Sequence, residues 1–329
     1  MTAKKYKIAI DVMGSDKGAG TLTEGAVKAL EANFDLEVVL FGDSNIIKDK
    51  LRELSYTTER IEIVHTADVI TNYDNPMEAI FKKTDSSLVK ALTALAQRDD
   101  IVGLINAGST GALLAGSLRY VPARELKRPA LAAILPSASG GFTCLVDTGA
   151  NIDCTPSQLV DFAHMGSDFM RESYGIDAPK IGLLSNGAEE TKGNKLVRET
   201  HMLLKDDKTL NFVGNIEGTN ALSGDCDVLV ADGFAGNQVL KNSEGIARRI
   251  ITDIVKYSKM TNNPEIMKLV SYLMSIYDFN SLGGGIVLGA GKHIIKAHGA
   301  ANADSIMNTS SMLLNMVKNK DVFNGKDNR

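Results

Sequence analysis

Short glycine-containing loops follow the apolar runs of this chain and carry most of its candidate chemistry. Each loop combines glycine with Asp, Asn, Ser, Thr, Lys or His. The six loops span residues 11–16, 106–111, 147–151, 186–194, 232–237 and 296–299. Glycine lets backbone N–H groups approach a ligand closely, and the start of a following helix favours an anion. In proteins that alternate strands and helices, such loops gather at the carboxyl ends of parallel strands. The set therefore predicts a composite polar site that binds phosphate.

Lys296 and His298 follow a short apolar pair near the end of the chain. Strand alternation would aim both side chains the same way. A lysine there could bind phosphate, while the imidazole donates to an oxyanion or moves a proton. The alternative is a surface lysine and a histidine packed on a helix start. Because Gly299 follows and a helix is expected to begin near Asn302, we prefer the functional interpretation.

Lys192 lies in the loop 186–194, directly before a glycine and Asn194. A helix is expected over residues 194–204, so backbone donors and a point charge converge at its start. Glu189 in the same loop could equally be a partner of that helix dipole. We predict Lys192 and Asn194, together with the lysine and histidine near the end of the chain, as catalytic residues.

Further loop residues are predicted to bind substrate or phosphate. Ser109 and Thr110 open a helix of small residues and could cap it or bind phosphate oxygens. Aspartates that end strands would normally repel phosphate or recruit Mg²⁺. Their spacing shows no metal cage, so we predict no metal site and interpret them mainly as acceptors that fix the loops. Asparagine and glutamate at these positions could also simply close turns. The predicted binding residues are Asp11, Gly14, Asn106, Ser109, Thr110, Asp147, Asn151, Glu189, Asn215, Glu217, Asp232 and Asn237.

The composition is that of an ordinary water-soluble globular protein. Of 329 residues, 44% are hydrophobic and 23% are charged. A formal net charge of −4 argues against a nucleic-acid partner, because such proteins usually carry a strong basic patch. Three cysteines form neither a disulfide framework nor a Cys-x-x-Cys pair, which favours a reducing cytosol. No signal-peptide or membrane-spanning pattern is present, so we expect a cytoplasmic protein.

Apolar runs alternate with helical stretches along the chain, which predicts a layered α/β fold in one catalytic unit over residues 1–329. The turn between residues 130–135 and 143–146 predicts a hairpin, and therefore a mixed sheet. Strands are expected at residues 7–10, 37–41, 61–64, 102–105, 130–135, 143–146, 180–184, 211–213 and 228–231. Helices are expected at 22–32, 44–54, 87–97, 110–118, 156–172, 194–204, 238–257, 264–276 and 302–317.

Residues 244–276 break this alternation, because two helical patterns follow one another without a strand between them. The hinge lies at residues 261–264, and the second pattern is apolar on nearly every side. Such a helix lies in a core, on a dimer face or at a membrane surface. We favour core or dimer contact over lipid, and we expect this subregion to contact a partner copy, an acyl chain or a membrane.

Taken in order, several motifs resemble those of one enzyme family. They are Asn-Ala-Gly-Ser-Thr-Gly-Ala from Asn106, Arg128-Pro-Ala, Glu-Glu-x-Lys-Gly-Asn from Glu189, Gly-Asn-Ile-Glu-Gly from Gly214, Asp-Gly-Phe-Ala-Gly-Asn from Asp232 and Ile-Lys-Ala-His-Gly from Ile295. The set resembles the phosphate acyltransferases that make acyl-phosphate from acyl–acyl carrier protein and inorganic phosphate in bacterial phospholipid synthesis. Val12, Ser15 and Lys17 depart from the usual first loop of that family, as does Leu282 from the usual tyrosine before the last strand.

The resemblance implies a three-layer αβα fold with a mixed, mostly parallel sheet, like isocitrate and isopropylmalate dehydrogenases and the related phosphotransacetylase. It also implies a homodimer and no metal or organic cofactor. The reaction needs held phosphate, donors for an oxyanion and a thiolate leaving group, but no nucleophilic side chain. No Gly-x-Ser-x-Gly motif occurs, and a catalytic Cys154 is the less favoured alternative.

An acyl carrier protein is strongly acidic, so its partner should present local positive charge. Candidate docking residues are Arg119, Arg124, Lys127 and Arg128, although such a cluster could simply be a solvated face.

Three alternatives to this function stay open. The first is a phosphotransacetylase-like enzyme that uses acyl–coenzyme A. The second is an NAD(P)-dependent dehydrogenase, which the absence of a Gly-x-Gly-x-x-Gly loop disfavours. The third is a non-catalytic peripheral membrane scaffold for lipid synthesis, for which peripheral membrane association would be essential.

Overall fold

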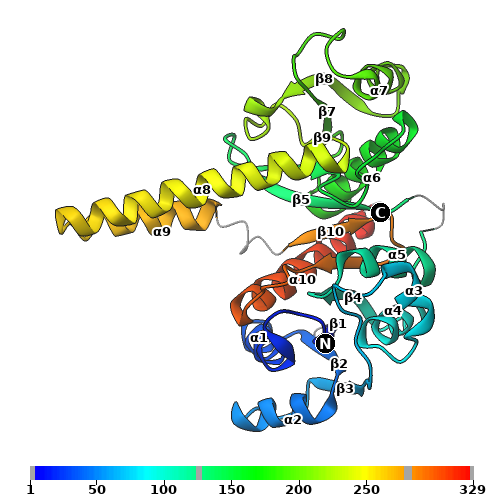
Figure 1. Cartoon of the computed structure of the whole chain (residues 1–329), viewed down its shortest axis with the longest axis vertical. Coiled ribbons are helices and arrows are strands. Elements are labelled where there is room, and N and C mark those ends of the chain that lie inside the picture. The colour runs from blue at the N-terminus through cyan, green and yellow to red at the C-terminus, as the bar shows by residue number, and fades with distance from the viewer. Residues whose placement is uncertain (1–3, 124–127, 278–283, 327–329) are drawn as a thin grey trace. The chain divides into compact units, whose positions relative to one another are not determined.

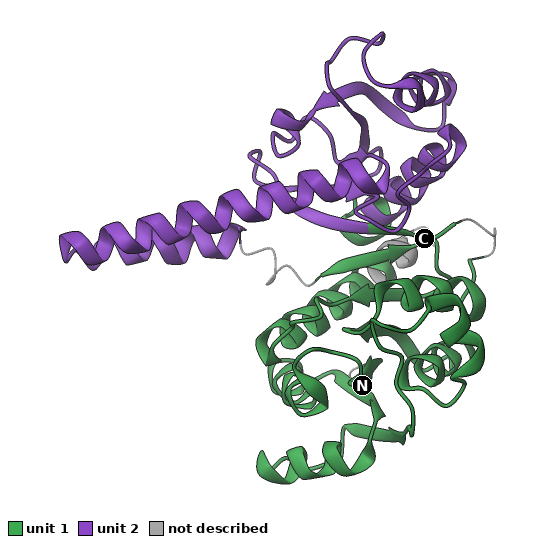
Figure 2. Cartoon of the chain, viewed as in Figure 1, with its two compact units in different colours: residues 1–131, 171–176, 283–329 green, residues 132–170, 177–282 purple. Residues whose placement is uncertain are grey.

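The computed structural model describes residues 4–123, 128–277 and 284–326, with side chains up to residue 320. The chain folds into two compact units (Figure 2). Unit 1 comprises residues 1–131, 171–176 and 283–329, and unit 2 comprises residues 132–170 and 177–282. The chain therefore packs as two units, each with most of its contacts within itself. That the whole chain serves one catalytic activity stays a prediction.

Unit 1 contains a sheet with the strand order β3-β2-β1-β4-β11-β10 (Figure 1). Its strands are β1 (Tyr6–Asp11), β2 (Leu36–Gly42), β3 (Ile61–His65), β4 (Ile101–Asn106), β10 (Gly285–Leu288) and β11 (His293–Lys296). All pair in parallel except β10, which is antiparallel to β11. Ile8, Ala9 and Ile10 of β1 are fully buried, as expected of a parallel strand covered on both faces.

Helices cover both faces of this sheet. One group is α1 (Gly18–Ala32), α2 (Ser44–Glu53) and α10 (Ala303–Lys326), and the other is α3 (Pro76–Lys82), α4 (Ser87–Gln97) and α5 (Thr110–Tyr120). Ala9 and Val39 pack in one hydrophobic cluster with α4 and α5. On the opposite face, Gly103 makes room for Leu313 of α10, since an added Cβ would lie 2.8 Å from its Cδ1. Unit 1 therefore has three layers.

Unit 2 contains the strands β5-β6-β9-β7-β8 in that order. They are β5 (Ala130–Pro136), β6 (Phe142–Val146), β7 (Lys180–Ser185), β8 (Asn211–Glu217) and β9 (Val228–Val230). The β5–β6 hairpin is antiparallel and the other pairs are parallel, which confirms the predicted mixed, mostly parallel sheet. The helices are α6 (Pro156–Tyr174), α7 (Lys195–Asp206), the 3₁₀ helix η1 (Gly218–Asn220), α8 (Gly233–Thr261) and α9 (Glu265–Tyr277).

α8 and α9 form a hairpin that extends away from the rest of unit 2 (Figures 1 and 2). Asn262 ends α8 in a left-handed conformation, with φ of 47°, which allows the reversal at the predicted hinge. Val270 of α9 is buried, whereas Leu269 and Tyr272 are 48% and 62% exposed. The outward face of α9 is therefore not covered by the described part of this chain, and contact with a partner copy, an acyl chain or a membrane stays a prediction.

The structure contains elements that the sequence pattern does not predict. α3 is one of them, because its seven residues are too short to show a helical period. Asn75 caps it and Pro76 occupies its first turn, which is the signal that identifies it. β10 lies in a glycine-rich stretch and has only four residues. α8 also begins at Gly233, ahead of the predicted residue 238.

The first turn of α8 packs directly on the loop that follows β6. A Cβ added to Gly233 would lie 2.6 Å from the Asn151 carbonyl oxygen. A Cβ added to Gly236 would lie far inside van der Waals contact of the Asp147 carbonyl oxygen. Backbone atoms cannot move aside as a flexible side chain can, so these two glycines set the distance between α8 and the β6 loop.

Gly236→Ala is expected to destabilise the protein by about 2 kcal/mol or more, because the new methyl group forces α8 away from the loop. Urea unfolding followed by circular dichroism measures the change. Gly245→Ala is the matched control in the same helix, since nothing lies within 4 Å of its added Cβ. The control should be neutral or gain up to about 1 kcal/mol. Equal stabilities for the two variants would contradict this packing.

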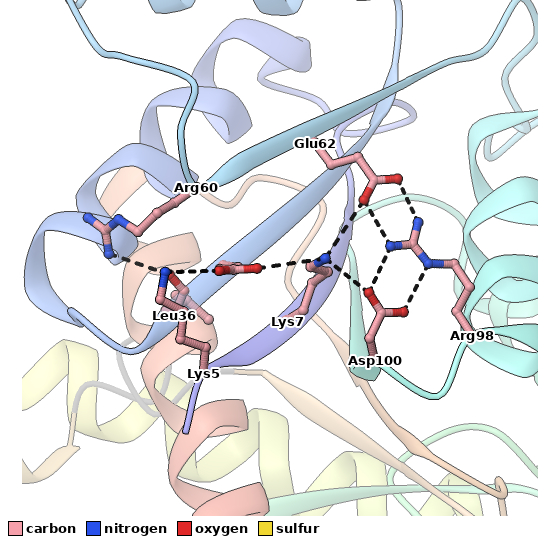
Figure 3. A network of polar contacts seen from close by, with 8 residues as sticks. Lys5, Lys7, Leu36, Arg60, Glu62, Arg98 and Asp100 are labelled. Carbon is pink, nitrogen blue, oxygen red and sulfur yellow. Dashed lines mark hydrogen bonds and ion pairs between the residues drawn. The ribbon is translucent and has the colours of Figure 1, made fainter. Parts of the chain in front are cut away.

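A network of ion pairs lies at the amino ends of the unit 1 strands (Figure 3). Arg98 makes a forked contact with Glu62, at 2.6 and 2.8 Å, and a second with Asp100, at 2.9 and 3.1 Å. Lys7 of β1 lies 2.9 Å from Asp100. Arg98, and then Lys7, holds the pKa of Asp100 well below its usual range. The network therefore joins the strands β1 and β3 to the segment before β4.

Arg98→Met should lower the free energy of unfolding at pH 7 by about 1 kcal/mol, because it removes two paired contacts from a network. The folded state depresses the pKa of Asp100, so the carboxylate stabilises the fold above pH 3.8 and loses this effect as it is protonated. The difference between wild type and variant should therefore shrink in urea titrations below about pH 4. Arg52→Met, which removes an exposed pair with Asp49, should change the stability little.

Candidate active site

Three neighbouring parallel strands of unit 1 end on residues that lie side by side. In the pairing register, Asp11 of β1 is opposite Asn106 of β4, and Asn106 is opposite Lys296 of β11. The carboxyl edge of these strands therefore carries a carboxylate, an amide and an ammonium group in one row. All three side chains are buried.

Asp11 and Asn106 hold the loops that follow their strands. The Asn106 Nδ2 donates to Asp11 Oδ2 at 2.8 Å, and the Met13 N–H donates to Asp11 Oδ1 at 3.0 Å. The Gly108 N–H donates to Asn106 Oδ1 at 3.1 Å. The interpretation of the strand-ending aspartates as acceptors that fix loops is confirmed for Asp11. A direct contact of Asp11 or Asn106 with phosphate stays a prediction.

Lys296 supplies a positive charge that is only 8% exposed. Its Nζ donates to the Ala297 carbonyl oxygen. Burial lowers the pKa of Lys296 to about 8, against the opposing attraction of Asp16 and Asp11. Burial raises the pKa of Asp11 to about 6, opposed by the Ser87 hydroxyl and by its hydrogen bonds. Near pH 7 the carboxylate of Asp11 and the ammonium of Lys296 are thus both mainly charged.

The start of α5 lies at the same edge as Lys296. Ser109 caps this helix, accepting from the Ala112 N–H at 3.4 Å, which confirms the predicted cap. Gly14 has a φ of 73°, and an added Cβ would lie 3.4 Å from Gly108 Cα, so glycine lets the first loop lie against the second. A helix N-terminus beside an ammonium group favours an anion. Thr110, the first residue of α5, lies in this region.

His298 lies just beyond the end of β11. Its side chain is exposed whereas Lys296 is buried, because the strand ends at Lys296 and alternation does not continue past it. The Ala300 N–H donates to His298 Nδ1 at 3.2 Å. A neutral imidazole in this arrangement carries its proton on Nε2, which can donate to a ligand.

The sequence-based assignment of binding residues did not include Asp16, which lies between β1 and α1. Its backbone N–H donates to the Gly299 carbonyl oxygen at 2.9 Å, which ties the first loop to the loop after β11. Its charge also acts on Lys296. The sequence analysis does count Asp16, which ends the first glycine-containing motif, among the aspartates that fix loops and could orient a lysine.

In unit 2, Asp147 organises the loop after β6. It is fully buried, and Oδ1 accepts from the N–H groups of Gly149, at 3.1 Å, and Ala150, at 3.0 Å. Its Oδ2 accepts from the backbone N–H and side-chain Nδ2 of Asn151, at 2.6 and 2.8 Å. Asp147 is therefore a loop-fixing acceptor, as interpreted from the sequence.

The neighbouring strand β9 ends at the cap of α8. Asp232 Oδ1 accepts from the Ala235 N–H at 2.8 Å, so Asp232 also fixes local structure. Asn237 follows in the same helix and is half-buried. An added Cβ at Gly149 would lie 3.8 Å from Asn237 Oδ1, so the loops of β6 and β9 meet at this point.

The loop after β7 carries Lys192. The Gly193 N–H donates to Asn186 Oδ1 at 2.8 Å, and Asn194 caps α7 by accepting from the Val197 N–H at 2.9 Å. The Lys192 side chain is exposed. The hydrogen bonds therefore hold the backbone of this loop, while the Lys192 side chain is exposed to solvent.

A buried pair that links α7 and β8 also supports this loop. His201 Nδ1 lies 2.9 Å from Asn215 Oδ1, and Asn215 Nδ2 donates to the Glu189 carbonyl oxygen at 2.9 Å. Asn215 thus closes the loop, while the side chains of Glu189 and Glu217 are exposed. His201, which the sequence analysis did not identify, is the residue that fixes the Asn215 amide.

The predicted residues thus form one group in each unit, at the carboxyl ends of that unit's parallel strands. The unit 1 group is Asp11, Gly14, Asn106, Ser109, Thr110, Lys296 and His298. The unit 2 group is Asp147, Asn151, Glu189, Lys192, Asn194, Asn215, Glu217, Asp232 and Asn237. The predicted catalytic residues are divided between the two groups, with Lys296 and His298 in one and Lys192 and Asn194 in the other.

Of the predicted docking residues, Arg119 and Arg128 are described, whereas Arg124 and Lys127 lie outside the described residues. The Arg119 guanidinium lies 4.0 Å from the centre of the Phe81 ring, and Arg128 is exposed. Among the described residues, no group of three His, Cys, Asp or Glu side chains could hold a metal ion. No helix in this described part is both long and apolar enough to cross a bilayer.

Comparisons with known proteins match nearly the whole chain. The family model described as "Fatty acid synthesis protein" matches residues 6–322. A phosphate acyltransferase of Halothermothrix orenii is 38% identical over 328 residues, with 96% of each chain covered. Another from Clostridium perfringens is 39% identical over 308 residues, covering 92% of this chain and 90% of the relative.

Solved structures show the same fold at low sequence identity. A branched-chain phosphotransacylase from Enterococcus faecalis matches with a TM-score of 0.60 at 18% identity, covering 94% of this chain and 99% of that one. A phosphotransacetylase from Streptococcus pyogenes matches with a TM-score of 0.62 at 15% identity, covering 95% and 94%. The predicted phosphotransacetylase-related α/β fold is therefore confirmed. The sequence matches go further than fold, and they show that the chain belongs to the fatty acid synthesis protein family, among the phosphate acyltransferases.

Proposed function

We propose that the protein transfers the acyl group of a long-chain acyl–acyl carrier protein to inorganic phosphate, and that the acyl-phosphate product feeds phospholipid synthesis. The observation that carries this proposal is the buried Lys296 ammonium, which lies at the same strand edge as the start of α5. A fixed cation and a helix N-terminus together suit an inorganic oxyanion. Membership of the phosphate acyltransferases supports the acyl-transfer part of the proposal.

In the proposed reaction a phosphate oxygen attacks the thioester carbonyl carbon. A carbon–oxygen bond forms, the carbonyl oxygen becomes an oxyanion, and the carbon–sulfur bond then breaks to release the pantetheine thiolate, which takes up a proton. Lys296 holds the phosphate and neutralises its charge. His298 Nε2–H donates to the oxyanion, as one preorganised donor. Lys192 and Asn194, in the loop that opens α7, are also proposed as catalytic residues.

Direct attack by phosphate needs no thiol nucleophile, and the chemistry of the cysteines supports this. Burial raises the pKa of both Cys144 and Cys226 to about 12, so neither forms a thiolate readily near neutral pH. The Cys154 thiol contacts the Asn151 carbonyl oxygen at 3.3 Å. We therefore assign no covalent acyl-enzyme intermediate.

The other loop residues are proposed to bind substrate or to shape the loops that do so. Ser109, Thr110 and Gly14 support phosphate binding in unit 1. In unit 2, Asn151 is proposed to shape the loop after β6, where its Nδ2 donates to Asp147. The half-buried Asn237 is proposed to bind substrate. Arg119 and Arg128 are proposed to attract the acidic carrier protein, as the complementary charge at a docking surface would.

The α8–α9 hairpin is proposed to be a contact surface, in the first place for a second copy of the chain. Ile246, Met260, Leu269 and Tyr272 are 48–83% exposed on it, which is unusual for large apolar side chains. A homodimer would cover this surface. Contact with the acyl chain or with the surface of a membrane is the alternative, and it would make a cytoplasmic protein peripherally membrane-associated.

A second candidate function is acyl transfer from coenzyme A thioesters. The phosphotransacylase and phosphotransacetylase folds match this chain, which keeps this alternative open. Assays with acyl–acyl carrier protein and acyl–coenzyme A of the same chain length separate the two functions. A non-catalytic scaffold for lipid synthesis predicts no phosphate-dependent loss of either thioester.

Lys296→Met should reduce turnover of acyl–acyl carrier protein by about 10² or more, because it removes a preorganised charge from the phosphate site. The measurement is phosphate-dependent thioester loss with purified protein, together with detection of acyl-phosphate. Lys48→Met, which alters an exposed lysine of α2, is the control and should keep wild-type turnover. Near-normal turnover by the Lys296 variant would remove this lysine from the active site.

Leu269→Asp should convert the proposed dimer to a monomer, because an exposed apolar contact is replaced by a charge that would be desolvated. Sedimentation velocity measures the mass, and circular dichroism checks the fold. Lys268→Asp, which alters the neighbouring exposed position, should leave the mass of the assembly largely unchanged. Flotation with anionic vesicles is run in parallel. A wild-type monomer that floats with vesicles would assign the hairpin to lipid instead.

A further inference from the structure

Asp16 is exposed, and two contacts tie it to the loop that follows Lys296. Its backbone N–H bonds the Gly299 carbonyl oxygen at 2.9 Å. A Cβ added to Gly299 would lie 3.1 Å from Asp16 Oδ2, 3.7 Å from Cγ and 3.8 Å from Oδ1. The whole carboxylate thus rests against the space that a side chain at Gly299 would fill.

Backbone conformation does not explain the glycine at position 299, because Gly299 is not among the glycines with positive φ. The close approach of the carboxylate does explain it. Gly299 lies three residues after Lys296, so the contact fixes Asp16 next to the loop that begins at that lysine. Alanine at position 299 would therefore press on the Asp16 carboxylate without straining the backbone.

The position of Asp16 matters because its charge affects the pKa of Lys296. Burial disfavours its ammonium form, and the attraction of Asp16, followed by that of Asp11, opposes this effect. His298 is the nearest other titratable group along this loop, and its Nδ1 is engaged by the Ala300 N–H. The first turn of α5 has no acidic residue, and Lys17 at the start of α1 is exposed.

Of the two carboxylates, Asp16 is the one whose only described role is electrostatic. Both oxygens of Asp11 accept hydrogen bonds that hold loops together, so replacing Asp11 would disturb structure as well as charge. We propose that Asp16, seated against Gly299, is a positioning residue that keeps the Lys296 ammonium charged for phosphate binding at alkaline pH. This inference rests on the proposed function of Lys296 as the phosphate-binding cation.

Asp16 has two electrostatic effects of opposite sign on phosphate binding. Its negative charge repels the phosphate anion directly, but it also keeps Lys296 protonated as the pH rises. Removing the charge should help or barely change binding at low pH, where Lys296 is protonated in either case. It should weaken binding at high pH, where the lysine of the variant loses its proton first. A variant with mere structural damage would bind phosphate more weakly at every pH.

The experiment compares wild type with Asp16→Asn by measuring KM for inorganic phosphate from about pH 6 to 9. Dividing the variant's KM by that of wild type cancels the ionisation of phosphate itself. The ratio is expected to be one or less near pH 6.5 and to rise about twofold to threefold by pH 8.5, as a shift of about half a pKa unit would give. The kcat at saturating phosphate should change much less. Asp304→Asn, which removes an exposed carboxylate at the start of α10, should give a flat ratio.

Gly299→Ala provides a second test, because its methyl group would lie 3.1 Å from Asp16 Oδ2 and push the carboxylate slightly outward. It should give a smaller pH-dependent rise of the KM ratio in the same direction, and it should have little further effect when combined with Asp16→Ala. A ratio that is independent of pH, or additive effects of the two substitutions, would overturn the inference.

Isothermal titration with inorganic phosphate alone separates this inference from the proposed function. A wild-type protein that binds phosphate without acyl transfer rejects the proposed function, and the pH dependence of the Kd ratio then decides the role of Asp16. A wild-type protein that binds no phosphate overturns both.

Discussion

The unit 1 site depends on holding an ammonium group in a place where water is largely excluded. Lys296 ends a buried strand, and its desolvation disfavours the charged form that an anion site needs. The carboxylates of Asp16 and Asp11 restore part of the lost stabilisation. Because the opposing effects leave its pKa at about 8, Lys296 stays charged at neutral pH but is sensitive to small changes in its surroundings. The strand register places Asp11 in the same row as Lys296, and the loop contacts tie Asp16 to the loop that follows Lys296.

The same constraint explains why so many polar residues of the site contact the protein itself. A loop can present backbone N–H groups to a ligand only if its own conformation is fixed. Asp11, Asp147 and Asp232 each use carboxylate oxygens to accept backbone N–H groups. The buried Asn215 instead donates its Nδ2 to the Glu189 carbonyl oxygen, which also holds a loop. Aspartates near a phosphate site are thus compatible with anion binding when their lone pairs are already engaged.

The two ends of the unit 1 strands have different tasks. The amino ends carry an ion-pair network, in which Arg98 contacts both Glu62 and Asp100 (Figure 3). The carboxyl ends carry isolated charges, helix starts and glycines. This division follows the rule that open α/β sheets bind ligands at the carboxyl ends of their strands.

The sequence by itself determined the class of fold, the glycine-containing loops at the strand ends and the family. Continuous apolar runs identified most of the parallel strands. Ser109 and Asn194 were recognisable as residues that open helices, and the order of the glycine motifs identified the relatives. These features are local, since each depends on a few consecutive residues. Short elements were missed for the same reason, because α3 and β10 offer too few residues for a period.

Only the tertiary structure decided how distant residues act on one another. The row of Asp11, Asn106 and Lys296 depends on strand register, which no local pattern encodes. Burial of Lys296 and exposure of His298, two residues apart, follow from where β11 ends. The contact between Asp16 and Gly299 joins residues that are far apart in the sequence. Only the packing of α9 decides that Val270 is buried while Leu269 and Tyr272 are exposed. Pairings of this kind arise from the folding of the whole chain, because desolvation and close approach are properties of assembled neighbours.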